Sequence, residues 1–184
     1  MKKILAIAHA LLIIYAMFHL ITQFQITDTF GELLILEADP YLIAVFNLLG
    51  LFPLAFLLFG FRYLNMTKST WVSLSMGFML GGFALTVPFI NQDLNKKKVS
   101  HKIHMVALIG LIGAVITIGY GLILGNISDY IDAFRTDSFI HIMTLDFLFL
   151  YLLSILLSFK VYRQPYYALI PVIGFFYLIF QDVD

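Results

Sequence analysis

Six apolar segments of about membrane-spanning length dominate the sequence and limit the folds that the chain can adopt. They cover residues 4–24, 41–61, 70–90, 103–124, 138–159 and 166–181. A bilayer core about 30 Å thick requires about 20 apolar residues per helix. The alternating pattern of membrane β-strands is missing, and backbone groups in lipid must be hydrogen-bonded internally. The sequence therefore predicts an all-α, polytopic transmembrane helical bundle of about six helices, forming one domain over residues 1–184.

The composition supports a protein of the lipid bilayer. Hydrophobic residues make up 61% of the chain and charged residues 12%, against about 45–50% and about 25% in ordinary soluble domains. The absence of cysteine excludes disulfides, thiol catalysis and cysteine-ligated metal sites. A formal net charge of zero gives no electrostatic reason to expect a nucleic-acid partner. The first apolar run is not followed by a small-x-small cleavage site, so we expect it to be retained as a helix.

The distribution of Lys and Arg predicts a cytoplasmic N-terminus in a bacterial plasma membrane, because Lys2 and Lys3 precede the first segment. Basic loops flank segment 70–90 on both sides, and both favour the cytoplasm. Either this segment turns back, which leaves five crossings, or all six segments cross and one half of the chain violates the rule that Lys and Arg stay on the cytoplasmic side. Gly81 and Pro88 permit a broken path, but an apolar run of this length usually crosses, so we favour six crossings. No internal repeat is evident.

The fifth segment carries two ionisable residues, His141 and Asp146. On a helical wheel they lie about 140° apart, so we expect each to find its partner on another helix. Thr144 and Tyr151 share a polar stripe, and Asp146 lies at its edge. A charged carboxylate here costs about 2.5–3.5 kcal/mol or more, so we expect Asp146 to be protonated. It is either a functional acid or a structural hydrogen bond between helices.

Polar residues in two further segments are candidates for a binding site. Tyr15 and His19 share one face of the first segment, and His9 lies nearer its start. These side chains either line a pocket or simply satisfy one another. Asn47 shares a face of the second segment with Pro53, which cannot donate a backbone hydrogen bond. A kinked helix lining a cavity and a purely structural kink both explain that pair.

No metal site or cofactor can be assigned from these residues. His101 and His104 stand at helical spacing beside lysines, but they lack nearby carboxylates, and a solvated helix start explains them better. Bis-histidine ligation of haem b would pair His9 or His19 with His141 or His104, and the partners depend on the topology. The paired-histidine spacing of b-type cytochromes is missing, so haem b is an unfavoured hypothesis.

Three stretches resemble the pattern of an uncharacterised family of small polytopic membrane proteins of cyanobacteria, plastids and other bacteria. They are FNLLGLFP (46–53), GGFALTVPF (81–89) and FIHIMTLDF (139–147). The family pattern reads FN-x-x-G-x-x-P, then G-x-F-x-L-x-P-[YF], then F-x-H-x-M-x-x-D-F, and the resemblance covers three of the six segments. It implies that Asn47, Pro53, Pro88, His141 and Asp146 matter together, and it carries over no catalytic residue.

Three classes of function fit these observations. The favoured one is a non-enzymatic bundle that binds a small or lipidic ligand, or supports assembly of a membrane complex with a protein partner. The second is an enzyme acting on lipid or isoprenoid substrates, with Asp146 as proton donor assisted by His19 or His141. The third is a proton-coupled transporter using Asp146, ranked last because only one broken segment is evident. No nucleotide-binding loop, zinc motif or nucleophile elbow is present.

Overall fold

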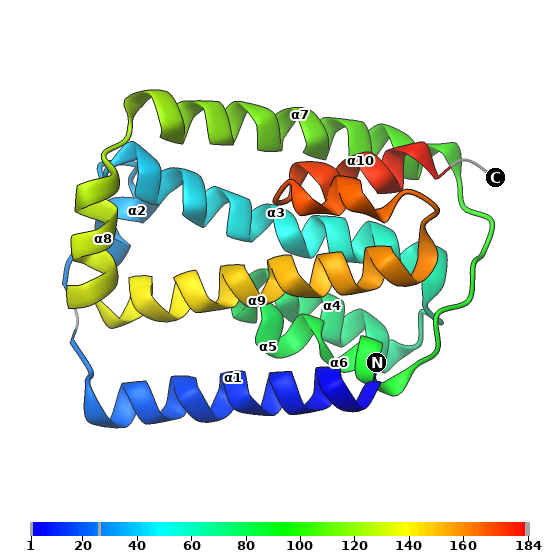
Figure 1. The fold of residues 1–184 in the computed structure, drawn as a ribbon, viewed down its shortest axis with the longest axis horizontal. Helices are drawn as coiled ribbons and strands as arrows, with labels where there is room; N and C mark the ends of the chain where they lie inside the picture. Colours follow the sequence, from blue (N-terminus) through cyan, green and yellow to red (C-terminus); the bar gives the residue numbers. More distant parts are fainter. Residues whose placement is uncertain (1, 26, 183–184) are drawn as a thin grey trace.

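Four long helices lying side by side form the frame of the protein (Figure 1). The computed structural model describes residues 2–25 and 27–182. This part of the chain contains α-helices, one 3-10 helix and loops, which confirms the all-α prediction. The helices that are long and apolar enough to cross a membrane are α1 (Lys2–Thr22), α3 (Pro40–Tyr63), α7 (His101–Leu124) and α9 (Ser138–Val161).

The central helices are α3 and α9, with α7 on the outer side of α3 and α1 on the outer side of α9 (Figure 1). Phe52, Phe56 and Phe59 share one face of α3, and none of them is exposed. The rings of Phe56 and Phe59 contact Phe89 and Phe175, which come from two later segments of the chain. The aromatic face of α3 is therefore the centre of the core.

Segment 70–90 does not form one crossing helix. It is divided into α4 (Lys68–Leu80), α5 (Gly82–Leu85) and α6 (Val87–Asn91). The chain reverses at Gly81, whose φ of 52° is a conformation that only glycine adopts easily. The two ends of the segment meet, because the Asn65 N–H donates to Gln92 Oε1 at 2.8 Å. The segment therefore does not supply one of the long helices that six crossings would require, and we name residues 68–91 hairpin 1.

The last apolar segment also turns back. It contains a 3-10 helix, η1 (Pro165–Leu169), and α10 (Ile173–Gln181), with the reversal at Val172. Both of its ends lie at Tyr63, whose ring contacts that of Tyr162 and whose hydroxyl donates to Asp182 at 2.6 Å. We name residues 165–181 hairpin 2. Four of the six predicted segments are thus single long helices, and the other two are hairpins.

Opposite charges gather at the two ends of the bundle. Ten of the eleven Lys and Arg residues lie at the end where α1 and α7 begin, here called the basic end. The opposite, acidic end carries seven carboxylates and a single cation, Arg135. Two short helices join the long ones there, α2 (Thr29–Leu34) and α8 (Ile127–Thr136), and α8 lies across their ends (Figure 1). Because hairpin 1 returns, both basic loops lie at one end, which removes the conflict in the sequence.

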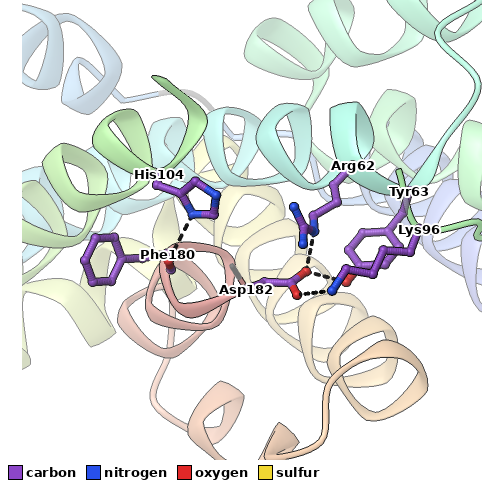
Figure 2. Close-up of polar contacts among 6 residues, drawn as sticks. All are labelled: Arg62, Tyr63, Lys96, His104, Phe180 and Asp182. Atoms are coloured by element: carbon purple, nitrogen blue, oxygen red, sulfur yellow. Dashed lines mark hydrogen bonds and ion pairs between the residues drawn. The ribbon is translucent and has the colours of Figure 1, made fainter. Parts of the chain in front are cut away.

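Asp182 fixes hairpin 2 at the basic end (Figure 2). Its carboxylate forms an ion pair with Arg62 and accepts hydrogen bonds from Tyr63 and from Lys96, the latter at 2.9 Å. Burial raises the pKa of Asp182, but the donors and the Arg62 charge outweigh burial and hold this pKa below its ordinary value. His104 on α7 adds a hydrogen bond to the Phe180 carbonyl at 3.0 Å.

We expect Gly81→Ala to destabilise the protein by at least 1–2 kcal/mol, about the cost of a left-handed backbone in other residues. A Cβ at Gly81 would also lie 1.7 Å from Asp146 Oδ2, so the carboxyl would have to move. Gly113→Ala is the matched control, since a Cβ there meets nothing within 4 Å. Thermal unfolding in detergent measures both, and equal stability of the two variants would contradict the described reversal.

Asp182→Asn should lower the free energy of unfolding by about 1–3 kcal/mol at neutral pH, the scale of hydrogen bonds to charged groups. Because the pKa of Asp182 is lowered by folding, its charge stabilises the protein above the unfolded value of about 3.9. This contribution is lost as the pH falls through the folded value. The difference between wild type and variant should therefore shrink below about pH 4. A difference that stays constant from pH 7 to pH 3 would contradict this assignment.

Candidate functional site

A polar pocket lies between α1 and α9 at the acidic end. Its volume is about 260 Å³, and we call it the α1–α9 pocket. Ten residues from the end of α1, the end of α8 and the start of α9 line it: His19, Thr22, Gln23, Gln25, Phe134, Arg135, Thr136, Asp137, Ser138 and His141. Nine of these ten side chains are polar, in a chain that is 61% hydrophobic.

The start of α9 supplies one wall of the pocket. Asp137 is the N-cap, and its carboxylate accepts from the Ile140 N–H at 3.0 Å. The same carboxylate accepts from the backbone N–H and the hydroxyl of Thr27, which follows α1. Burial raises the pKa of Asp137, but the hydrogen bonds from these donors lower it by more than burial raises it. The pKa therefore lies below its ordinary value. A charged Asp137 therefore ties the two sides of the pocket together.

Ser138, on the same wall, forms hydrogen bonds with residues at the end of α1 and just after it. Its hydroxyl accepts from the Gln25 N–H at 2.9 Å and lies 3.2 Å from the Gln23 carbonyl. The His19 Nε2 atom also lies 3.2 Å from this hydroxyl. A hydroxyl has one proton, so donation to Gln23 leaves His19 Nε2–H as the donor to Ser138. The hydroxyl and its neighbours thus form a continuous hydrogen-bonded rim.

The second histidine has a defined tautomer. His141 Nδ1 lies 3.1 Å from the Phe134 carbonyl, an acceptor, so Nδ1 carries the proton. Nε2 then accepts from the Tyr15 hydroxyl at 2.8 Å. The His141 ring stacks on the His19 ring at 4.3 Å and on the Phe134 ring at 4.4 Å. Face-to-face imidazoles do not aim their nitrogens at a common iron, so the arrangement does not fit bis-histidine haem ligation by this pair.

Asp146 lies at a second polar centre, inside the bundle. It is 4% exposed, and its Oδ1 accepts from the Gly82 N–H at 2.8 Å. The following two residues of α5 also bind side chains. His9 Nε2 donates to the Phe83 backbone carbonyl at 2.9 Å, and the Ser73 hydroxyl donates to the Ala84 backbone carbonyl. One turn of α5 thereby binds side chains from α9, α1 and α4. Asp146 joins hairpin 1 to the long helices, which is the structural role that the sequence left open.

The remaining predicted residues lie outside these two centres. The Thr144 hydroxyl bonds with that of Tyr130 at 2.7 Å. The Tyr151 hydroxyl donates to the Leu169 carbonyl at 2.6 Å and so holds hairpin 2. Asn47 is exposed on α3. His141 and Asp146 have different partners, as the wheel indicates, and among the described residues no hydrogen bond joins Asp146 to His19 or His141.

Sequence reasoning found His19 and His141 but missed the residues that complete the pocket. Asp137 directly precedes a long apolar run, which is a typical N-cap signal that could have been used. Nothing local to Ser138 or Gln25 indicates that they meet, because more than 100 residues separate them. Within the described residues, no group of three or more metal-ligating side chains occurs.

All three family-like stretches meet in space. Gly82 of the second stretch binds Asp146 of the third, and the Phe52 ring of the first contacts the Phe147 ring of the third at 5.4 Å. Asn47, from the first stretch, lies exposed on α3 and takes no part in these contacts. Comparison with known proteins finds no matching family model, no matching curated protein and no matching solved structure.

Proposed function

We propose that the chain is a multi-pass membrane protein with four crossings and two half-membrane hairpins. The basic end then lies in the cytoplasm together with Lys2 and Asp182, the first and last described residues, because Lys and Arg are retained on that side. Non-helical backbone is tolerated at membrane depth where protein buries it. The reversal of hairpin 1 at Gly81 is buried, and Val172 in hairpin 2 is 0% exposed. Both hairpins therefore meet this requirement.

The α1–α9 pocket binds, in this proposal, the headgroup of a phosphate-bearing lipid. The observation that carries it is a donor-rich pocket at the outer end of an otherwise apolar bundle. Arg135, the single Lys or Arg at the acidic end, lines this pocket, and guanidinium groups suit phosphate oxygens. The Asp137 carboxylate is already bound by Thr27 and Ile140, so its charge is compensated by donors.

The outer face of α1 offers a place for the acyl chains of such a lipid. Ile14, Phe18 and Ile21 are 63%, 57% and 76% exposed, and they belong to the same helix end as His19. Their apolar surface would lie in the hydrocarbon core while the headgroup enters the pocket. Headgroup and tail would then be recognised by adjoining surfaces.

Proton-coupled transport is the second candidate, and one observation now favours it. Transporters place broken helices in two related halves, and this chain has a second broken segment, hairpin 2, that the sequence did not reveal. No corresponding support arises for an enzyme, because Asp146 is not hydrogen-bonded to either pocket histidine in the part of the chain that the structure describes.

Single cysteines at Lys68 and Asp93 should be labelled from the same side of the membrane. Both residues lie at the basic end in this structure, whereas a crossing of segment 70–90 would separate them. Cysteines at Asp28 and Asp129 should react only from the opposite side. A membrane-impermeant maleimide on cells and on inverted vesicles measures this without interference, because the chain has no native cysteine. Labelling of residues 68 and 93 from opposite sides would contradict the four-crossing topology.

Phosphatidylglycerol should raise the unfolding temperature of the purified protein in detergent, while diacylglycerol, which lacks the phosphate, should not. A ligand at 100 times its Kd stabilises the folded state by about 2.7 kcal/mol. Arg135→Gln should abolish the shift, and Arg163→Gln, at the basic end, is the matched control. An equal shift with diacylglycerol, or an unchanged shift in Arg135→Gln, would contradict phosphate recognition at this pocket.

A further inference from the structure

The helices occur twice in the same order. A long helix, a short helix, a second long helix and a hairpin follow one another as α1, α2, α3 and hairpin 1, and again as α7, α8, α9 and hairpin 2 (Figure 1). Helices α3 and α9 each have 24 residues, and each has an aspartate N-cap. Their caps, Asp39 and Asp137, are 98 positions apart, and so are the first residues of α2 and α8, Thr29 and Ile127.

The packing also follows a twofold relation. Helix α1 packs on α9 as α7 packs on α3, and α5 of hairpin 1 touches α9 as α10 of hairpin 2 touches α3. Both α2 and α8 touch α3 and α9. A twofold axis along the bundle, between α3 and α9, exchanges these pairs and agrees with the order α7, α3, α9, α1 across the molecule (Figure 1).

Hydrogen bonds between the halves repeat in the same way. Asp39 accepts from the backbone N–H of Asn126, the residue before α8, at 3.0 Å. Asp137 accepts from the backbone N–H of Thr27, two residues before α2, at 2.9 Å. Each aspartate therefore caps its own long helix and also binds the short-helix region of the other half. The aspartates are equivalent, and the backbone groups that they bind differ by one position in the repeat, which chance resemblance of helix order alone would not produce.

We infer that the chain is a fused dimer of one membrane unit, with units at residues 2–98 and 99–182, and that the α1–α9 pocket is the open member of a symmetric pair of junctions. His19 lies three residues before the end of α1 and contacts Ser138, the first residue of α9. Gly121 lies three residues before the end of α7, next to Pro40, the first residue of α3. The two pairs occupy equivalent places.

The second junction is closed by close backbone packing. A Cβ at Gly121 would lie 2.5 Å from the Cβ of Ala44 and 3.5 Å from the Pro40 carbonyl oxygen. Gly125 is in similarly close contact with Tyr41. Gly121 and Pro40 thus allow α7 and α3 to pack directly against each other, which we call a sealed junction. His19 and Ser138, at the equivalent places, border a cavity of about 260 Å³. His19 and Ser138 are the residues that distinguish the open junction, and their assignment to ligand binding rests on the function proposed above.

The duplication is tested by a circular permutant of the full chain, in which residues 99–184 precede residues 1–98. A flexible linker of about 20 residues joins the old ends. The described residues nearest to those ends, Lys2 and Asp182, lie at the basic end, where Lys2 pairs with Asp93 and Asp182 pairs with Lys96. This permutant breaks the chain between the two units. It should insert, show the same cysteine-labelling pattern and unfold within a few degrees of the wild type.

The matched control permutant uses the same linker but begins at Thr67, so residues 67–184 precede residues 1–66. Its break also lies at the basic end, but it separates hairpin 1 from the α3 of its own unit. It should unfold at a clearly lower temperature than the first permutant. If the first permutant is destabilised as much as this control, or fails to insert, the division into two units is overturned.

The open and sealed junctions are tested by exchanging their residues. His19→Gly should remain folded and weaken phosphatidylglycerol binding by about tenfold, the effect of losing a hydrogen-bonding group worth about 1.4 kcal/mol. Gly121→His should unfold at a much lower temperature, since the imidazole has no space. Equal stability of the two variants would overturn the open and sealed assignment. If the wild type binds no phosphatidylglycerol, the proposed function fails, while the permutants and the stability comparison still decide the duplication.

Discussion

The hydrogen bond from the Gly82 N–H to the buried Asp146 carboxyl is the interaction on which the topology depends. It holds hairpin 1 where the chain reverses at Gly81, and this reversal returns the chain to the end that it left. Helix α7 consequently begins at the same end as α1. Had the segment crossed, the second half would be inverted relative to the first, and the basic residues would be divided between both ends.

The two halves of the chain run in the same direction, and this explains why α1 and α7 have equivalent places in the bundle but different neighbouring side chains. Helices α1 and α7 both lie on the outside, and each packs on the start of a central helix from the other half. Small residues allow α7 to approach α3 closely. On the other side, stacked imidazoles and a serine hydroxyl occupy the equivalent interface, and they leave the α1–α9 pocket beside them. The polar site thus arises where one of two equivalent interfaces lacks close backbone packing.

Sequence reasoning reached part of the site because helical periodicity is local. The wheel separated His141 from Asp146 and grouped Tyr15 with His19, and the structure places the first pair with different partners and stacks the second. Periodicity cannot say which helices are neighbours. It therefore did not bring His19 to Ser138, and it left Asn47 a candidate although that residue is exposed on α3.

The sequence by itself determined that the chain is helical, apolar and organised in six segments, because hydropathy and helix periodicity are properties of short stretches. Only the tertiary structure decided that two segments are hairpins, since reversal depends on a glycine conformation supported by a carboxyl 64 residues away. The twofold relation also left no recognisable repeat in the sequence, because helices of similar length can pack in the same way with different side chains. Pairing of distant segments, which creates the pocket, is a property of the packed molecule alone.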